Sequence, residues 1–468
     1  MRARRESRPA RADQRRDSGV SEVNVIDDPD VLESLSHDDA EWAPYGRPVG
    51  AVRPLTTADV QEVVAFCAER QIPIVPRGAG TGLSGGANAV DGAMILDLSK
   101  MNRIVEIDTE NLTATVQPGV INDDLKKAVA EHGLWYPPDP ASAPWSTIGG
   151  NVSTNAGGLC CLKYGVTRDY VLGLEAVVGG PAGAYGTVVK LGRRTTKGVA
   201  GYDLAGLFTG SEGTFGVITE ITVRLRPARR EAPRTVVGAF GSVVAAGEAV
   251  AAVTRAGLVP AALELLDRTC LRAVEEWKHL GLEADAAALL LAQLDTPGDE
   301  EATAVAGVFR AAGALWAEQS TDEIEAEALF AARRLAYPAL ERLSPVLTED
   351  ICVPRSKVPQ MLASIEEIAA RHGSTIATIA HAGDGNLHPL ILAPAGDEQA
   401  KRAAQAAFED MLAAAIALGG TVTGEHGVGL LKRAGMKQEL SPAVLAMQVA
   451  VKQTLDPLNL FNPGKVIG

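Results

Sequence analysis

Two short motifs in the second half of the chain bring together residues that could bind a metal ion. In HAGDGNLH, His381 and His388 flank a Gly-Asp-Gly turn, and in GEHGVG, Glu425 precedes His426. Two imidazoles and one carboxylate form a ligand set for Zn²⁺ or Mn²⁺ that leaves coordination positions open for a substrate. Neither motif is a metal signature by itself. The residues alone therefore leave two interpretations, a metal site at His381, His388 and Glu425, or histidines of a core or a loop.

Three loops in the first half are rich in glycine and small polar residues. PRGAGTGLSGGA, residues 76–87, follows an apolar segment and offers a row of unobstructed backbone N–H groups, as an anion-binding nest does. No GK[ST] follows it, and no helix opens directly after it, so it is neither a Walker loop nor a good dinucleotide fingerprint. A structural glycine loop is the alternative. The loops at 136–158 and 210–219 favour an extended polar ligand that contacts all three.

The elements around these loops predict a loop-rich α+β domain over residues 40–230. A helix is expected to begin with Thr57 as its cap, and a second with Asn122 as its cap and to end at Gly133. Period-two alternation predicts a hairpin at 104–107 and 113–116. Further strands are expected at 50–53, 72–75, 93–98, 171–178 and 217–225.

After residue 230 the composition changes to alanine-rich amphipathic helices that alternate with strands. Helices are predicted at 242–256, 268–280, 299–312, 357–372 and 398–418, and strands at 236–240, 262–266, 288–294, 350–353 and 376–380. This alternation around one antiparallel sheet predicts a second α+β domain, ferredoxin-like, over residues 231–440. Residues 441–468 contain a helix and DPLNLFNPGK and are expected to return to the first domain. The arginine-rich residues 1–22 are expected to be a disordered tail.

Composition and charge exclude several classes of protein. The 468 residues carry 44 basic and 58 acidic side chains, a net charge of −14, so nucleic-acid binding is not expected. No apolar run approaches the ~18 residues of a transmembrane segment, and the N-terminus lacks the apolar core of an export signal. The five cysteines form no CxxC pair, which fits reduced thiols. We therefore expect a cytoplasmic protein, peripheral to a membrane only through a redox partner.

The three loops, their order and their spacing, together with FNPGK at 461–465, resemble the FAD-linked oxidases of the vanillyl-alcohol oxidase/p-cresol methylhydroxylase type. Within that family, the chain is most similar to glycolate oxidase flavin subunits and D-lactate dehydrogenases. The resemblance spans residue 40 to the C-terminus. It implies a two-part FAD-binding domain of the p-cresol methylhydroxylase type with an α+β cap domain for the substrate.

The resemblance also implies which residues contact FAD. The pyrophosphate would be held by Pro76, Arg77, Gly78, Ala79, Gly80, Thr81, Gly82, Leu83 and Ser84. The rest of the cofactor would be lined by Pro138, Asp139, Ser142, Gly149, Gly150, Ser153, Thr154, Asn155, Gly158, Gly213, Ile218 and Asn462. No histidine lies between residues 38 and 131, and Cys161 is expected to be an ordinary thiol, so we predict FAD that is bound non-covalently.

In the 2-hydroxy-acid dehydrogenases of this family, residues that match His381, His388 and Glu425 hold a divalent ion, and the one that matches His426 accepts a proton. The resemblance further implies that Arg333 binds the substrate carboxylate, with an exposed helix arginine as the alternative. Asn386 is expected to donate a hydrogen bond to the substrate. A metal ion bound to an alcohol lowers the pKa of its hydroxyl, which makes histidine a suitable base.

The sequence around residue 348 bears on the substrate. Hydroxyglutarate dehydrogenases carry a lysine where this chain has Thr348, and Glu349 and Asp350 follow. Acidic side chains would repel a second carboxylate, so we expect a short D-2-hydroxy acid, D-lactate or glycolate. The alternatives are D-2-hydroxyglutarate as substrate, a metal-dependent hydrolase, or a non-catalytic subunit.

The predicted electron acceptor is a quinone, a cytochrome, oxygen, or a partner flavoprotein or iron–sulfur subunit, because the chain has no CxxCxxC cluster of its own. A homodimer is considered for the assembly.

Overall fold

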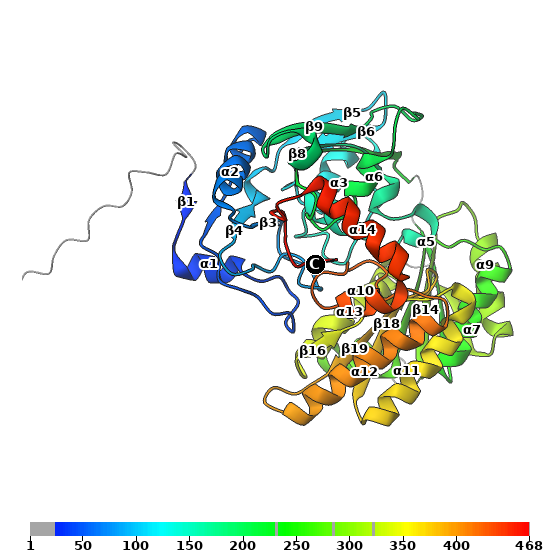
Figure 1. Cartoon of the computed structure of the whole chain (residues 1–468). Helices are drawn as coiled ribbons and strands as arrows, with labels where there is room; N and C mark the ends of the chain where they lie inside the picture. The colour runs from blue at the N-terminus through cyan, green and yellow to red at the C-terminus, as the bar shows by residue number, and fades with distance from the viewer. Residues whose placement is uncertain (1–23, 230–232, 283–285, 321–322, 468) are drawn as a thin grey trace, which may run out of the picture.

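The computed structural model describes residues 24–229, 233–282, 286–320 and 323–467 (Figure 1). The predicted tail at 1–22 and the predicted domain boundary at 230 lie outside these residues. The fold is of the α+β type that the sequence predicts. Across the described residues, no helix combines the length and apolar character needed to cross a membrane.

Two sheets form the first part of the chain. A four-stranded sheet has the order β1 (Val25–Ile26), β2 (Gly50–Val52), β4 (Met94–Asp97) and β3 (Ile74–Arg77). A five-stranded antiparallel sheet has the order β5 (Ile104–Asp108), β6 (Thr113–Val116), β10 (Val217–Arg224), β8 (Val171–Val178) and β9 (Thr187–Gly192). Val52 and Ile74 of the first sheet share one buried cluster with Val177 and Val217 of the second. The two sheets therefore form one body, from which the glycine-rich loops project.

Short helices and one two-stranded ribbon fill the connections between these strands. The helices are α1 (Pro29–Leu35), α2 (Thr57–Arg70), α3 (Asn122–Ala130), α4 (Ile148–Thr154), α5 (Cys161–Tyr164) and α6 (Leu204–Phe208), and β7 (Leu134–Trp135) pairs with β11 (Arg226–Pro227).

Two predicted helix starts are wrong in detail. The cap of α2 is Thr56, which forms a capping box with Asp59, and Thr57 is the first helical residue. The side chain of Asn122 does not cap α3, because its amide donates to Asn151 and to the carbonyl of Pro138.

The second part is built on an eight-stranded sheet. Its order is β15 (Ala314–Ser320), β12 (Arg234–Phe240), β14 (Ala288–Leu294), β13 (Ala262–Asp267), β18 (Thr375–His381), β19 (Asn386–Leu392) and β16 (Val346–Thr348), with β17 (Ile351–Cys352) also paired to β19. All of these pairs are antiparallel, as predicted.

Helices cover both faces of this sheet. The helices α7 (Val243–Arg255), α9 (Glu300–Ala311), α11 (Val358–His372) and α12 (Glu398–Ala417) pack on one face (Figure 1). The helices α8 (Arg268–Lys278) and α10 (Glu323–Glu341) pack on the other. Side chains alternate between the faces, so Leu263 and Leu265 join the first core and Ala262 and Leu266 the second. By the same alternation, residue 264 points to the face of α8 and α10.

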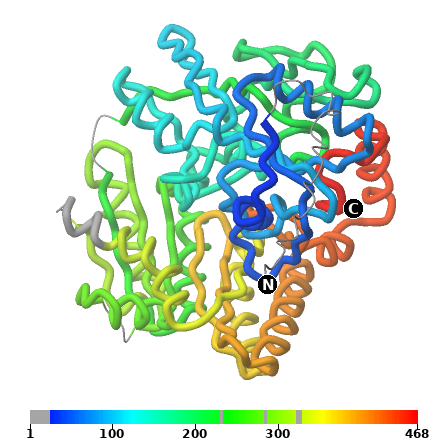
Figure 2. Tube along the Cα trace, turned by 90° about the vertical axis from the view of Figure 1, so that its left-hand side faces the viewer, coloured from blue at the N-terminus to red at the C-terminus, as the bar shows by residue number. Residues whose placement is uncertain are grey.

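The C-terminal segment connects both parts. After α13 (Arg433–Glu439) and α14 (Pro442–Leu455), Phe461 forms a bridge with Ile74 of β3, and the N–H of Asn462 donates to the carbonyl of Ile74 at 2.7 Å. Leu460 and Phe461 are buried in the core of the first part. Figure 2 shows this red segment beside the blue N-terminal strands. The end of the chain therefore packs against the strand that leads into the first glycine-rich loop.

Candidate active site

Two neighbouring strands position the histidines of the first motif. His381 is the last residue of β18 and is paired with Asn386, whereas His388 lies on β19 and is paired with Ile379. Both imidazoles point to the face of the sheet that α8 and α10 cover further along, and their ring centroids are 5.3 Å apart at 87°. The tight turn between the strands thus places two imidazoles side by side in a fixed register.

Glu425 completes a three-residue cluster with them. Its Oε1 lies 3.2 Å from Nε2 of His381 and 3.2 Å from Nε2 of His388, and all candidate ligand atoms lie within 4.8 Å of one another. Burial alone would raise the pKa of Glu425, yet it lies well below its ordinary value because of the two imidazoles. The three residues fit a divalent cation, since a buried carboxylate among converging nitrogens requires a positive partner.

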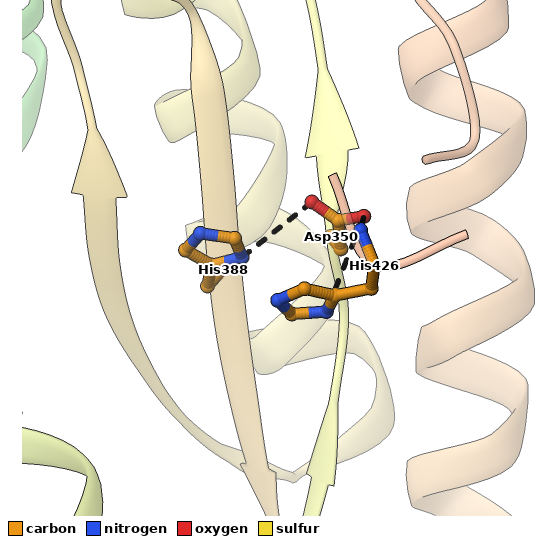
Figure 3. A group of neighbouring side chains, drawn as sticks. All are labelled: Asp350, His388 and His426. Atoms are coloured by element: carbon orange, nitrogen blue, oxygen red, sulfur yellow. Dashed lines mark hydrogen bonds and ion pairs between the residues drawn. The ribbon is translucent and has the colours of Figure 1, made fainter. Parts of the chain in front are cut away.

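A second group of three, Asp350, His388 and His426, shares His388 with this cluster. Figure 3 shows the three side chains of this second group. The Asp350 carboxylate accepts the backbone N–H groups of Gly424 at 3.0 Å, Glu425 at 3.1 Å and His426 at 2.9 Å. It also accepts the hydroxyl of Thr423 at 2.7 Å and the amide of Asn386 at 2.8 Å. These donors occupy both oxygens, so Asp350 anchors the loop that carries Glu425 and His426 rather than serving as a metal ligand.

His426 stacks on His388, with the ring centroids 4.9 Å apart and the planes 10° from parallel. Its Nδ1 lies 4.0 Å from Asp350. Burial lowers the pKa of His426 to about 4, and His388 adds to the decrease, whereas Asp350 and Glu425 oppose it. The imidazole is therefore neutral near pH 7, in the state that can accept a proton.

One large cavity joins this loop to the glycine-rich loops. Its wall includes the segment 76–84, parts of the loops at 140–156 and 212–218, and both Glu425 and His426. Among the lining residues, His426 is the one histidine, and none is a cysteine. The candidate base therefore faces the same space as the loops predicted to bind the cofactor.

The first glycine-rich loop fits an anionic ligand. No backbone N–H from Gly78 to Gly86 donates a hydrogen bond to another described residue. Gly80 has a φ of +81°, a conformation that residues with side chains rarely adopt. Backbone donors without a protein partner at the wall of a cavity are what a pyrophosphate group requires. The backbone N–H groups of this loop therefore fit the pyrophosphate group of FAD.

The structure brings most of the predicted cofactor residues to this wall. They are Pro76, Arg77, Gly78, Ala79, Gly80, Thr81, Gly82, Leu83, Ser84, Ser142, Gly149, Gly150, Ser153, Thr154, Gly213 and Ile218. The wall also includes residues that were not predicted, among them Asp38, Pro118, Thr147 and Glu212.

The other five, Pro138, Asp139, Asn155, Gly158 and Asn462, are not among the residues that line the cavity. Asn462 donates to the carbonyls of Gly86 and Glu212, so it ties two of the loops together. Asn155 ends α4 in a left-handed conformation. Asp139, which follows Pro138, accepts the N–H of Cys160, and Gly158 lies against the backbone of Asp139.

Two residues predicted to contact the substrate have protein partners in the structure, and their contact with the substrate stays a prediction. The amide nitrogen of Asn386 donates to Asp350 at 2.8 Å and to the carbonyl of Ile351 at 3.0 Å, which makes it a support for the anchor of the loop. Arg333 is 6% exposed, and its Nε lies 2.9 Å from Glu264. It is therefore not the exposed arginine of the alternative interpretation.

The repulsion argument made for Glu349 and Asp350 is wrong. Both side chains are fully buried; Glu349 lies 3.4 Å from Nζ of Lys432, and Asp350 holds the 423–426 loop. Neither lines the cavity, so neither presents negative charge to a substrate there. Thr348 does not line this cavity either but a small separate one, so the significance of the missing lysine stays a prediction.

The anchoring roles of Asp350 and Glu264 could not have been found from the sequence. Asp350 lies 76 positions from His426, and Glu264 lies 117 positions from His381. No local pattern marks such contacts. The one signal in the sequence is an acidic residue, Glu264, between the apolar residues of the strand Ala262–Asp267.

Comparisons with known proteins agree with this geometry. Residues 48–191 match the model of an FAD binding domain, and residues 229–466 match that of the C-terminal domain of FAD linked oxidases. The chain is 41% identical over 451 residues to the glycolate oxidase subunit GlcD of Bacillus subtilis, covering 96% of this chain and 95% of that protein. It is 34% identical over 466 residues to a D-lactate dehydrogenase of Anaerostipes hadrus, with 96% and 95% covered.

A solved structure shows the same fold. The crystal structure of p-cresol methylhydroxylase with substrate bound superposes with a TM-score of 0.78 at 21% identity, covering 94% of this chain and 93% of that one. The two matched domains lie on the two parts of the structure that enclose the cavity. With its glycine-rich wall and its family models, the chain belongs to the FAD-linked oxidases.

Proposed function

We propose that the protein oxidises a short 2-hydroxy acid, glycolate or D-lactate, to the 2-oxo acid with FAD as the oxidant. The observation that carries this proposal is that Glu425 and His426 line the same cavity as the glycine-rich loops. A hydroxy acid bound beside His426 would lie next to the space for the flavin. Relatives named glycolate oxidase subunit and D-lactate dehydrogenase support this class of substrate.

The reaction removes a proton from the hydroxyl and a hydride from Cα. Bound FAD supplies the hydride acceptor, and a divalent ion held by His381, His388 and Glu425 supplies a Lewis acid that lowers the pKa of the substrate hydroxyl. His426 accepts the hydroxyl proton on its imidazole. His426 is held in place because its ring stacks on His388 and its own backbone N–H donates to Asp350. The buried surroundings keep the imidazole neutral before each turnover.

The residues named for the metal would equally suit a hydrolase that activates water. That function leaves the cavity wall from Gly78 to Ser84 without a ligand, and membership of the FAD-linked oxidases speaks against it. D-2-hydroxyglutarate is the less favoured substrate, because Thr348 has no charge and, unlike a lysine, cannot form an ion pair with a distal carboxylate.

A cytoplasmic location and an external electron acceptor belong to the same proposal. The described structure has no cysteine ligand set for an iron–sulfur cluster, since the candidate metal groups contain only histidine, aspartate and glutamate. Electrons would then leave the flavin to a quinone, a cytochrome, oxygen or a partner protein.

The purified protein is expected to be yellow, to release its FAD into the supernatant on acid precipitation, and to bleach anaerobically with glycolate or D-lactate. L-lactate and D-2-hydroxyglutarate serve as matched controls and should bleach it far more slowly. Flavin that stays in the pellet would contradict non-covalent binding. A yellow protein that no short 2-hydroxy acid bleaches would overturn the proposed substrate class.

A further inference from the structure

We propose that Glu264 is a positioning residue that fixes the tautomer of His381 and couples that imidazole to Arg333. The inference rests on the proposed metal site, of which His381 is a ligand. It assigns a role to a buried carboxylate that takes no part in the chemistry described above.

The Glu264 carboxylate contacts two other charged or titratable groups, the His381 imidazole and the Arg333 guanidinium. Both carboxylate oxygens lie 2.9 Å from Nδ1 of His381, and Oε2 lies 2.9 Å from Nε of Arg333. The side chain of Glu264 has no exposed surface, and those of His381 and Arg333 are 8% and 7% exposed. A carboxylate so deeply buried is stable only with such partners.

Three different elements deliver these side chains to one place. Glu264 lies on β13, which pairs with β18 at Leu265 and Ala380, so residue 264 and His381 are neighbours across the pair. Arg333 comes from α10, the helix that covers this face of the sheet. The contact is therefore built into the packing of the sheet and the helix, rather than into a loop.

The hydrogen bond decides which ring nitrogen of His381 carries the proton. A carboxylate can only accept, so Nδ1 must be the donor, and the neutral ring then presents the lone pair of Nε2. Nε2 is the nitrogen that lies 3.2 Å from Glu425 within the cluster. A carboxylate behind a metal-binding histidine orients the ring and raises its basicity, and its loss costs about 10–100-fold in metal affinity.

Arg333 acts on the same imidazole through Glu264. Its guanidinium places a positive charge beside the buried carboxylate that accepts from His381. Through Glu264, this arginine influences the metal site without touching the cluster itself. Arg333 is thus a second positioning residue, one contact further from the cluster.

The test replaces Glu264 by Gln and measures the affinity for Zn²⁺ by competition with a chelator, with FAD bound. The single amide oxygen would remain with the charged Arg333, and the amide N–H would face Nδ1 of His381. The imidazole would then have to carry its proton on Nε2, where it blocks the metal. We expect a loss of about 10–100-fold in affinity, an unchanged FAD content, and a shift of the His381 ring signals to the other tautomer in ¹⁵N-histidine spectra.

The control is Asp267→Asn on the same strand. Asp267 is also buried, but it accepts backbone N–H groups of Cys270 and Thr378 rather than a histidine. This variant should retain the wild-type affinity for Zn²⁺ and the wild-type tautomer of His381. An equal loss of affinity in both variants would mean a general effect on the sheet and would overturn the assignment.

Arg333→Lys keeps a positive charge and gives a second test if the Gln variant does not fold. It should weaken Zn²⁺ binding in the same direction but by less, whereas Arg334→Ala, at the exposed neighbouring position of α10, should not. Wild-type affinity for Zn²⁺ in the folded Glu264→Gln or Arg333→Lys protein would overturn the positioning role of Glu264 and would leave the metal site itself unaffected. A wild-type protein that binds no Zn²⁺ would overturn the metal site, whereas a difference in the ¹⁵N signals of His381 between the wild type and the Glu264→Gln variant would still show the contact with Glu264.

Discussion

Replacing His426 by Gln is expected to slow the reduction of the flavin by about 10²–10⁴-fold, which is the usual contribution of a positioned acid–base group. Glutamine keeps much of the size of the ring and can form hydrogen bonds, but it cannot accept the hydroxyl proton. The backbone N–H of residue 426 still donates to Asp350, so the loop should keep its position. Stopped-flow absorbance under anaerobic conditions measures the rate.

The metal content of the same variant separates two roles for His426. As the base, it is not a ligand, so the Gln variant should hold as much metal and FAD as the wild type. A metal-free variant would contradict the assignment and would make His426 a fourth ligand beside Glu425. The exposed His279, which ends α8, provides the matched control, because His279→Gln should leave the rate unchanged.

The second large effect is expected for His381→Ala. This change removes one of three ligands and should release the ion, with a loss of turnover on the order of 10²–10³-fold, because a Lewis acid contributes several kcal/mol to such a step. FAD should stay bound, since His381 is not part of the cavity wall. In one sample, metal analysis measures the loss of the ion and the flavin absorbance measures the retained FAD. Loss of FAD together with the metal would show that the two sites depend on each other structurally.

Regular elements with strong periodicity could be predicted to the residue. β8 and β14 have the predicted bounds, Val171–Val178 and Ala288–Leu294, because each is a mostly apolar segment followed directly by a clear turn signal. α10 was missed. It contains Pro338, a residue that normally argues against a helix interior. β15 was also missed, since an edge strand buries few of its side chains and shows little alternation.

The components of the site could be predicted, but not the contacts that support them. Glycine-rich loops and paired histidines leave a local pattern, so the cavity wall and the cluster of His381, His388 and Glu425 were expected. The anchors Asp350 and Glu264 act across strand pairs and loops far apart in sequence. In the sequence, nothing distinguishes their carboxylates from those of other acidic residues, because the backbone N–H groups and the imidazole that they contact are known only from the structure. For the same reason, the hydrogen bond from Asn386 to Asp350 was not predicted.

The most direct test of the account follows the flavin in one preparation of the wild-type protein before and after the metal is removed. The protein is treated with a chelator, dialysed, mixed anaerobically with glycolate or D-lactate, and then supplied with Zn²⁺ or Mn²⁺. The account predicts that the chelated protein keeps its FAD, that the flavin stays oxidised with substrate present, and that bleaching resumes when the ion is added. Bleaching at the full rate in the metal-free protein would contradict it.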